Sequence, residues 1–273
     1  MPEGHTLHRL AREQQRLFGG RIVRLSSPQG RFVDGAAALD GHVLRRAEAY
    51  GKHLLHRYDN GLILHVHLGL YGKFLSGVGE PPEPVGALRL RLIGDGVYAD
   101  LRGATACELL DKSGWTAIRA RLGPDPLRRD ADPAAAASRL LRSKTSVAAL
   151  LMDQQVLAGV GNVYRAELLF RHGVDPFLPG ARLAPEIWDA MWADLVVLMK
   201  SGVRLGQIVT VRPEHRARKR GRLDRAEAVY VYRRNGLPCR VCGTEVRTQE
   251  LVGRNLFWCP NCQAPGNGSS SGG

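Results

Sequence analysis

The stretch Leu150-Leu151-Met152-Asp153-Gln154-Gln155-Val156-Leu157-Ala158-Gly159-Val160-Gly161-Asn162-Val163-Tyr164 decides how the second half of the chain folds. An apolar helix runs into a Gly-x-Gly-Asn turn, and a second helix follows with Asn162 as its expected N-cap residue. Free backbone amides at a helix start, beside glycines that allow close approach, form a phosphate-binding site. A capped helix hairpin is often purely structural, so its interpretation depends on the rest of the chain.

The charge balance favours a polyanionic partner. The chain has 273 residues, with 39 Lys and Arg against 26 Asp and Glu, a net charge of +13 and a pI of about 10.1. Nucleic acid is the first candidate for such a basic protein, and an anionic membrane surface is a distant second. With 44% hydrophobic residues, no apolar run near ~20 residues and no secretory signal, we expect a soluble cytoplasmic protein.

Four of the five cysteines form two C-x2-C pairs, Cys239 with Cys242 and Cys259 with Cys262. This spacing fits one tetrahedral structural zinc ion, and disulfides are the weaker alternative in a chain without a secretory signal. Between the pairs, Glu245–Trp258 is expected to form two strands with Arg254 near the tip. There Arg254 either reaches a phosphate or is ordinary surface charge. Cys107 stands alone and is expected to be a buried small hydrophobe.

The pattern along the chain predicts an α+β fold with a β-sandwich or flattened barrel in front and helices behind. A helix is expected over Thr6–Phe18, because apolar residues recur at spacings of three and four and Gly19-Gly20 ends the pattern. From Arg21 to about Leu110 the pattern changes to short β-like runs separated by glycine and proline, of which six examples follow. They are expected at Arg21–Ser26, Val43–Ala49, His53–Tyr58, Leu62–His67, Leu88–Ile93 and Val97–Asp100.

Helical periodicity returns after a proline-rich junction. We expect a domain over 1–125, a linker over 126–133, a helical domain over 134–227, a zinc module over 228–263 and a disordered tail over 264–273. The basic stretch 212–225 is expected near the polyanion. The expected helices are Ala134–Leu141, Ser146–Gln155, Val163–His172, Pro185–Met199 and Val203–Ile208.

The amino terminus, Met1-Pro2-Glu3-Gly4, is a candidate reaction centre. If Met1 is removed, Pro2 becomes a secondary amine with a carboxylate beside it. An α-amine titrates near pH ~8, so part of it is uncharged and nucleophilic at neutral pH. Most chain ends are only frayed and solvated, which is the competing interpretation.

Three features of the first half carry a weaker signal. Lys52 follows Gly51 at the start of a strand, where a lysine is usually solvated surface. His65 and His67 share one face of a strand, but no third metal ligand has a convincing spacing, so we expect satisfied or partly buried histidines. Leu70 and Tyr71 lie in a glycine-flanked loop and either fill the gap left by an extruded base or fold onto the core.

Together these motifs resemble the formamidopyrimidine-DNA glycosylase and endonuclease VIII family of bifunctional DNA glycosylase/AP lyases. The resemblance extends to about Gln263 and includes five ordered motifs. They are Pro2-Glu3-Gly4, Gly51-Lys52, Leu122-Gly123-Pro124-Asp125-Pro126-Leu127, the helix-two-turn-helix signature from Met152-Asp153-Gln154 to Gly161-Asn162-Val163-Tyr164, and the zinc hairpin.

The resemblance implies a β-sandwich domain, a helix-two-turn-helix domain and a zinc finger with four cysteine ligands, with DNA in the cleft between the domains. It implies that Pro2 attacks C1′ of the damaged nucleotide to form a Schiff base and that Glu3 handles protons at the sugar. Lys52 would hold phosphate and assist β-elimination, and Arg254 would support δ-elimination. Arg121 and Asn162 match DNA contacts, and Leu70 with Tyr71 matches the void-filling loop.

Departures from the family pattern bear on the substrate. Thr6 replaces a glutamate found in many members, and Asp100-Leu101-Arg102-Gly103-Ala104 lacks the aromatic residue of the oxidised-purine enzymes. Gly69 replaces a glutamine of some endonuclease VIII relatives. With His5, these features favour the endonuclease VIII branch and oxidised pyrimidines.

The alternatives are an oxidised-purine glycosylase, an enzyme acting chiefly on abasic sites, and a non-catalytic zinc protein that marks DNA damage. We expect damaged double-stranded DNA as partner, one structural Zn²⁺, no small-molecule cofactor, no membrane association, a monomer, and a cytoplasmic protein that joins the nucleoid on binding DNA.

Overall fold

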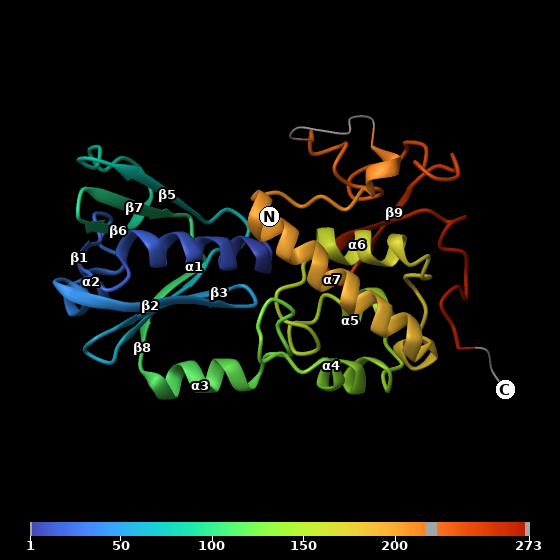
Figure 1. Cartoon of the computed structure of the whole chain (residues 1–273), viewed down its shortest axis with the longest axis horizontal. Coiled ribbons are helices and arrows are strands. Elements are labelled where there is room, and N and C mark those ends of the chain that lie inside the picture. Colours follow the sequence, from blue (N-terminus) through green and yellow to red (C-terminus); the bar gives the residue numbers. More distant parts are fainter. Residues whose placement is uncertain (1, 217–222, 271–273) are drawn as a thin grey trace. The chain divides into compact units, whose positions relative to one another are not determined.

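The computed structural model describes residues 2–216 and 223–270, and it divides the chain into two units, Met1–Arg121 and Leu122–Gly273 (Figure 1). Each unit has its own hydrophobic core. The division precedes the expected boundary at 125, because the 122–125 stretch hydrogen-bonds to the second unit. The amide of Gly123 donates to the Gln154 carbonyl over 2.8 Å, and Ala158 donates to the Pro124 carbonyl over 3.0 Å.

The first unit is built on one antiparallel sheet of eight strands, in the order β5-β7-β6-β1-β2-β3-β4-β8. Strand β1 joins its two halves, because Ile22 and Val23 pair with β2 while Arg24, Leu25 and Ser26 pair with β6. The elements are α1 (Gly4–Phe18), β1 (Ile22–Ser26), α2 (Val33–Leu39), β2 (His42–Tyr50), β3 (His53–Tyr58), β4 (Ile63–His67), β5 (Lys73–Val78), β6 (Leu88–Gly94), β7 (Val97–Arg102), β8 (Ala106–Leu110) and α3 (Lys112–Ala120).

Both halves of the sheet contribute to a single core. Leu44, Leu54 and Leu64 from one half and Leu92 and Leu101 from the other are fully buried in it. Helix α1 adds Leu7, Ala11 and Phe18 to the same core. The expected sandwich-type α+β unit is therefore confirmed, although β5 and β8 were not among the strands placed from the sequence and α2 and α3 were not expected.

Two hydrogen bonds set the register of α1 along β2. The amide of Gly20 donates to the Leu44 carbonyl over 2.8 Å, and the amide of Ala47 donates to Oε1 of Gln15 over 2.7 Å. The helix therefore runs back along β2 toward the turn that joins β2 to β3. Figure 1 shows the start of α1 and this turn at the same end of the sheet.

The second unit is helical and ends in a β-hairpin. Its elements are α4 (Pro133–Leu140), α5 (Val147–Leu150), α6 (Asn162–Arg171), the 3-10 turns η1 (Gly180–Arg182) and η2 (Pro213–His215), α7 (Pro185–Leu205), β9 (Arg247–Leu251) and β10 (Arg254–Trp258). Two helix predictions were wrong. The α-helix expected over 146–155 is confined to α5 and followed by turns. No separate helix forms at 203–208, because 203–205 are the end of α7 and Gly206 caps it.

A buried glutamate fastens the zinc module to the helices. Glu167 on α6 is fully buried, and its carboxylate accepts from the amides of Tyr230, Val231 and Tyr232 over 2.7 to 2.9 Å and from the Thr210 hydroxyl. Several N–H donors satisfy a buried carboxylate, which would otherwise be costly to desolvate. The chain after α7 is thereby held against α6.

The segment after the last cysteine also packs on this unit. Asp175 donates its amide to the Asn267 carbonyl over 3.0 Å, and Ser269 forms a bridge with Leu183. Up to Ser270 this differs from the disordered tail expected from composition, because backbone groups of 266–270 have partners in the 174–184 loop. Residues 271–273, and part of the basic stretch 212–225, lie outside the described residues.

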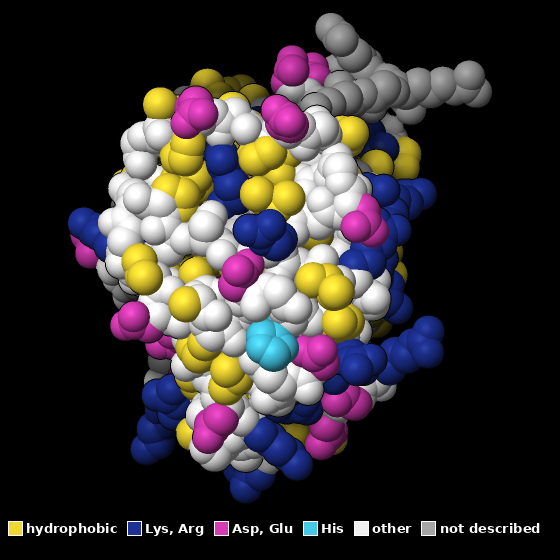
Figure 2. Space-filling view, turned by 90° about the vertical axis from the view of Figure 1, so that its left-hand side faces the viewer, with side chains coloured by type: hydrophobic (Ala, Val, Ile, Leu, Met, Phe, Trp, Pro, Cys, Tyr) yellow, Lys and Arg dark blue, Asp and Glu magenta, His cyan; other side chains and the backbone are white. Residues whose placement is uncertain are grey.

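No helix among the described residues is long and apolar enough to cross a bilayer. Figure 2 shows the end of the first unit that carries β1 and α2, where Lys and Arg alternate with Asp and Glu. The net positive charge is therefore not gathered on that face.

Candidate functional site

The acidic residue of the amino-terminal motif is buried at the start of α1. Glu3 is the N-cap residue, its backbone is extended (φ −120°, ψ 176°), and its carbonyl accepts from the Thr6 amide over 2.8 Å. Its side chain is 0% exposed, next to the half-buried Pro2. The positive end of the helix dipole favours negative charge at this position. Met1 lies outside the described residues.

The register of α1 places Glu3 at the same position along the direction of β2 as Lys52. From Gln15 back to Glu3 the helix rises ~18 Å, and from Ala47 to Lys52 the strand advances ~17 Å. Gly51 and Lys52 form the two-residue turn between β2 and β3, where Tyr50 pairs with His53. Gly51 has a φ of 56°, as the first turn position of a type II′ hairpin requires. Two residues predicted for one site thus lie at the same end of the first unit.

Arg121 belongs to the same neighbourhood. It is the exposed C-cap residue of α3. The pKa of His53 falls to about 3 because the ring is buried, and the nearby charges of Arg121 and Lys52 lower it further. Lys52 and Arg121, the phosphate contact and the DNA contact predicted in the first unit, therefore both lie near one histidine.

His53, His65 and His67 form a cluster at this end of β3 and β4. Nδ1 of His53 lies 2.8 Å from Nε2 of His65, and Nδ1 of His65 lies 2.7 Å from Oε1 of Glu108 on β8. The ring of His67 meets His53 edge-on at 5.3 Å. Among the described residues only the four paired cysteines have their ligand atoms close enough for a metal, so these histidines bind one another instead.

The loop of Leu70 and Tyr71 presents two apolar side chains to solvent, 42% and 84% exposed. Its backbone is held at both ends, because Gly72 donates to the Leu68 carbonyl over 2.9 Å and Gly69 donates to Nδ1 of His67 over 3.2 Å. Gly69 has a φ of 66°, and a Cβ there would lie 1.8 Å from the Thr105 hydroxyl. The glutamine of some relatives does not fit this backbone. The alternative in which both side chains fold onto the core is not what the structure shows.

The segment compared with the purine-enzyme loop is mostly strand. Asp100, Leu101 and Arg102 end β7, and Asp100 is buried against Arg91 with contacts of 2.7 and 2.9 Å. Arg102 lies 3.5 Å from the same carboxylate. The strand expected over Val97–Asp100 therefore extends by two residues, and Arg102 is engaged within its own sheet.

Asn162 is the first residue of α6, and the prediction that it caps the helix was wrong. Gly161 is the N-cap residue. The side chain of Asn162 is buried, donates from Nδ2 to the Asn255 carbonyl over 2.9 Å and accepts from Nη2 of Arg165. Asn162 is thereby tied to the zinc hairpin, beside Arg254.

Arg254 begins β10 directly after the hairpin turn. Val252 and Gly253 form this turn with φ values of 53° and 64°, and Leu251 pairs with Arg254. Positive φ at both positions defines a type I′ turn. Arg254 is exposed, as predicted for a side chain at the tip, and the structure brings it next to Asn162 within the second unit.

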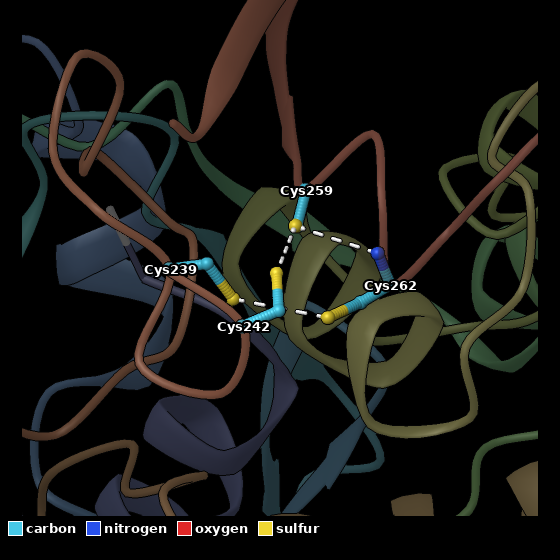
Figure 3. A group of neighbouring side chains, drawn as sticks. All are labelled: Cys239, Cys242, Cys259 and Cys262. Carbon is cyan, nitrogen blue, oxygen red and sulfur yellow. Dashed lines mark hydrogen bonds between the residues drawn. The ribbon is translucent and has the colours of Figure 1, made fainter. Parts of the chain in front are cut away.

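The four cysteines converge on one point (Figure 3). Their sulfur atoms all lie within 4.8 Å of one another, with 3.9 Å between Cys239 and Cys262 and 3.4 Å between Cys242 and Cys259. Zn–S bonds of ~2.3 Å in a tetrahedron place sulfurs ~3.8 Å apart, so the donor set fits one structural zinc ion. All five cysteines are free of disulfides, and burial raises the pKa of Cys107 to about 12, as suits an inert thiol.

The chain matches three domain families in order. Residues 1–107 match the formamidopyrimidine-DNA glycosylase N-terminal domain, residues 122–213 match the formamidopyrimidine-DNA glycosylase H2TH domain, and residues 236–265 match the zinc finger found in FPG and IleRS. "Endonuclease 8 1" of Mycobacterium tuberculosis is 57% identical over 267 residues, covering 96% of this chain and 100% of the relative.

The chain belongs to the formamidopyrimidine-DNA glycosylase and endonuclease VIII family. Members of this family are DNA glycosylases with AP lyase activity, and this chain is one of them. A "Formamidopyrimidine-DNA glycosylase" of Geobacillus kaustophilus is 32% identical over 262 residues, covering 92% and 91% of the two chains. A Lactococcus lactis FPG mutant in complex with a Fapy-dG containing DNA shares the fold with a TM-score of 0.80, at 20% identity and covering 96% and 100%.

Some functional side chains escaped the sequence analysis. Glu108 contacts His65 through β8, a strand that was not placed from the sequence, and the buried Arg165 donates to the side chain of Asn162. The spacing of His65 and His67 was the only signal available, because their partners come from other strands.

Proposed function

We propose that this protein removes oxidised pyrimidines from double-stranded DNA through a Schiff base at Pro2 and then cleaves the strand by β,δ-elimination. The observation that carries the proposal is the buried carboxylate of Glu3, which follows Pro2 at the start of α1 and is level with Lys52. A nucleophile and a proton-transfer group on adjacent residues are what base excision with strand cleavage requires.

The Pro2 nitrogen attacks C1′ as the N-glycosidic bond breaks and the base leaves with the bonding pair and a proton. The C1′–O4′ bond then breaks and O4′ takes a proton, and because the amine is secondary, the product is an iminium ion that stays cationic and withdraws electrons from C2′. Loss of a C2′ proton then expels the 3′ phosphate, and a second elimination expels the 5′ phosphate. Glu3 carries protons at the sugar, while Lys52 and Arg254 hold the phosphates.

The pyrimidine preference is supported by the 57% identity to a protein named endonuclease 8. It is also supported by Arg102, which is held by Asp100 instead of projecting from a loop. Arg121 and Asn162 complete the proposed DNA contacts. Zinc at the four cysteines stabilises the hairpin that carries Arg254. The enzyme acts as a monomer in the cytoplasm, on the nucleoid.

Parallel duplexes carrying thymine glycol, 8-oxoguanine or a preformed abasic site test the substrate class, with an undamaged duplex as control. We expect rapid strand cleavage at thymine glycol and at the abasic site and slow cleavage at 8-oxoguanine. Rapid cleavage at 8-oxoguanine with none at thymine glycol would place the protein among the oxidised-purine enzymes. Cleavage of the abasic duplex alone would show that the protein has AP lyase activity but no glycosylase activity on these bases.

A further inference from the structure

The histidine cluster beside Lys52 has a defined pattern of hydrogen-bond donors and acceptors. The carboxylate of Glu108 carries no hydrogen and only accepts, so Nδ1 of His65 donates to it over 2.7 Å. A neutral imidazole has one donor and one acceptor nitrogen, so Nε2 of His65 is then an acceptor. The nitrogen 2.8 Å away, Nδ1 of His53, must therefore be the donor. Through two hydrogen bonds, Glu108 selects the tautomer of a histidine two strands away.

The rings meet in the geometry that such a relay needs. The planes of His53 and His65 are inclined by only 20° with centroids 5.0 Å apart, as expected for rings joined edge to edge through a hydrogen bond. Trp115 on α3 lies 6.2 Å from His53 and 6.4 Å from His65 and is itself buried. The strands fix the partners, because β3 pairs with β4 and β4 pairs with β8.

The relay leaves Nε2 of His53 as a lone-pair acceptor. Among residues 2–216 and 223–270 no hydrogen-bond partner of this atom is found. His53 is also absent from the residues of that part of the chain whose fully buried polar atoms lack a partner, so Nε2 is accessible. Burial and the surrounding charges of His65, His67, Arg121 and Lys52 hold the pKa of His53 at about 3, so the ring is neutral at physiological pH. The groups facing it are therefore the basic side chains of Arg121 and Lys52, two histidines and the Trp115 ring.

We propose that Glu108, His65 and His53 form a tautomer-selecting relay that presents Nε2 of His53 as an acceptor for the Lys52 ammonium and so positions Lys52 on the DNA phosphate. His53 is a positioning residue in this scheme, because it acts through Lys52. A neutral acceptor orients an ammonium ion without neutralising it, so Lys52 keeps its full charge for the phosphate. This inference rests on the proposed role of Lys52 in DNA cleavage.

The tautomers are measured directly in the free protein by long-range ¹⁵N–¹H correlation spectra of the histidine rings at pH 7.5. We expect protonated Nδ1 and unprotonated Nε2 in both His53 and His65, and a mixture of tautomers in Glu108→Gln, because an amide either donates or accepts. Unprotonated Nδ1 at His53 in the unchanged protein would overturn the relay, whatever the protein does to DNA.

The positioning role is tested by single-turnover cleavage of a preformed abasic duplex at saturating protein. His53→Phe keeps the ring volume without the acceptor, and His53→Gln keeps an acceptor near the place of Nε2. We expect His53→Phe to slow cleavage about tenfold, the effect of one hydrogen bond to a charged group, and His53→Gln to restore most of the rate. Equal loss in both variants, or no loss in either, contradicts positioning by an acceptor. An unchanged protein that cleaves nothing contradicts the proposed function instead.

Discussion

The side chain of Asn162 donates from Nδ2 to the main-chain carbonyl of Asn255 over 2.9 Å. This contact joins the first turn of α6 to the zinc hairpin at the residue that follows Arg254. A family-typical asparagine and the hairpin arginine therefore form one structural unit, although 91 positions (254 − 162 − 1) separate them in the sequence. The hairpin and the helix start are thereby held together, as the DNA contacts proposed for Asn162 and Arg254 require.

Arg254→Ala is expected to weaken binding to abasic duplex and to slow the second elimination. The side chain is exposed, so the fold loses little. Loss of one phosphate contact lowers the slope of log affinity against log salt by about 1. Arg247→Ala is the matched control, since Arg247 is exposed on the same hairpin but pairs with Trp258 at its far end. Equal effects of the two variants would contradict a specific role for the tip arginine.

Removal of zinc is expected to weaken DNA binding strongly while the first unit stays folded. The hairpin packs in a small cluster that includes Cys239 and Cys259, and such a module has little core without the metal. Cys259→Ser should contain no zinc by elemental analysis and bind abasic duplex much more weakly. Cys107→Ser, in the separate core of the first unit, should retain one zinc per chain. Unchanged DNA affinity in zinc-free protein would refute this dependence.

Tyr71→Ala is expected to leave the melting temperature unchanged and to reduce cleavage of a damaged base about tenfold, because stacking of an aromatic ring on a base is lost. The comparison variant is Val78→Ala, which removes an apolar side chain that is 87% exposed on β5. Base excision is measured separately from cleavage at a preformed abasic site. A melting temperature that falls only in Tyr71→Ala would show that the side chain packs on the protein instead.

Stability is expected to fall as the pH drops below about 6.5. Burial lowers the pKa of His56 to about 3, and its Nε2 lies 2.5 Å from Oε1 of Gln14. The unfolded chain binds a proton near pH ~6.5 and the folded chain only near pH 3, so the unfolded state holds more protons between these values. Stability from this group is complete above the unfolded pKa and declines by about 1.4 kcal/mol per pH unit through the window.

Urea titrations between pH 4 and pH 8 measure this slope, with His56→Leu as the comparison. The variant lacks the titrating ring, so its unfolding free energy should depend less steeply on pH in the same window. Parallel curves for the two proteins would show that His56 does not contribute to the acid sensitivity.

The sequence predicted the features that depend on local spacing. The two C-x2-C pairs, the helix from Thr6 and strands such as His53–Tyr58 follow from neighbours in the chain, and the structure contains them. Strand β8 has the helix-favouring sequence Ala-Cys-Glu-Leu-Leu and becomes a strand only by pairing with β4. Strand β5 lies at the sheet edge and lacks clean alternation.

The same limit applies to the candidate site. Asn162 has the sequence signal of an N-cap residue, yet its side chain bonds to Asn255 instead. The relay from Glu108 to His53 crosses three strands, and no spacing in the chain indicates it. Long-range partners set the roles of these polar side chains, whereas sequence periodicity reports only on neighbours.

The central claim is that Pro2 is the nucleophile, and it requires that Met1 be removed, because a retained methionine would make Pro2 an amide without a nucleophilic lone pair. Borohydride trapping on an abasic duplex, with the amino terminus verified by intact mass, tests this most directly. We predict a covalent protein–DNA adduct that maps to Pro2 and whose yield falls sharply in Pro2→Gly. Correctly processed protein that cleaves the duplex without any trappable adduct, or an adduct on another residue, would contradict the account.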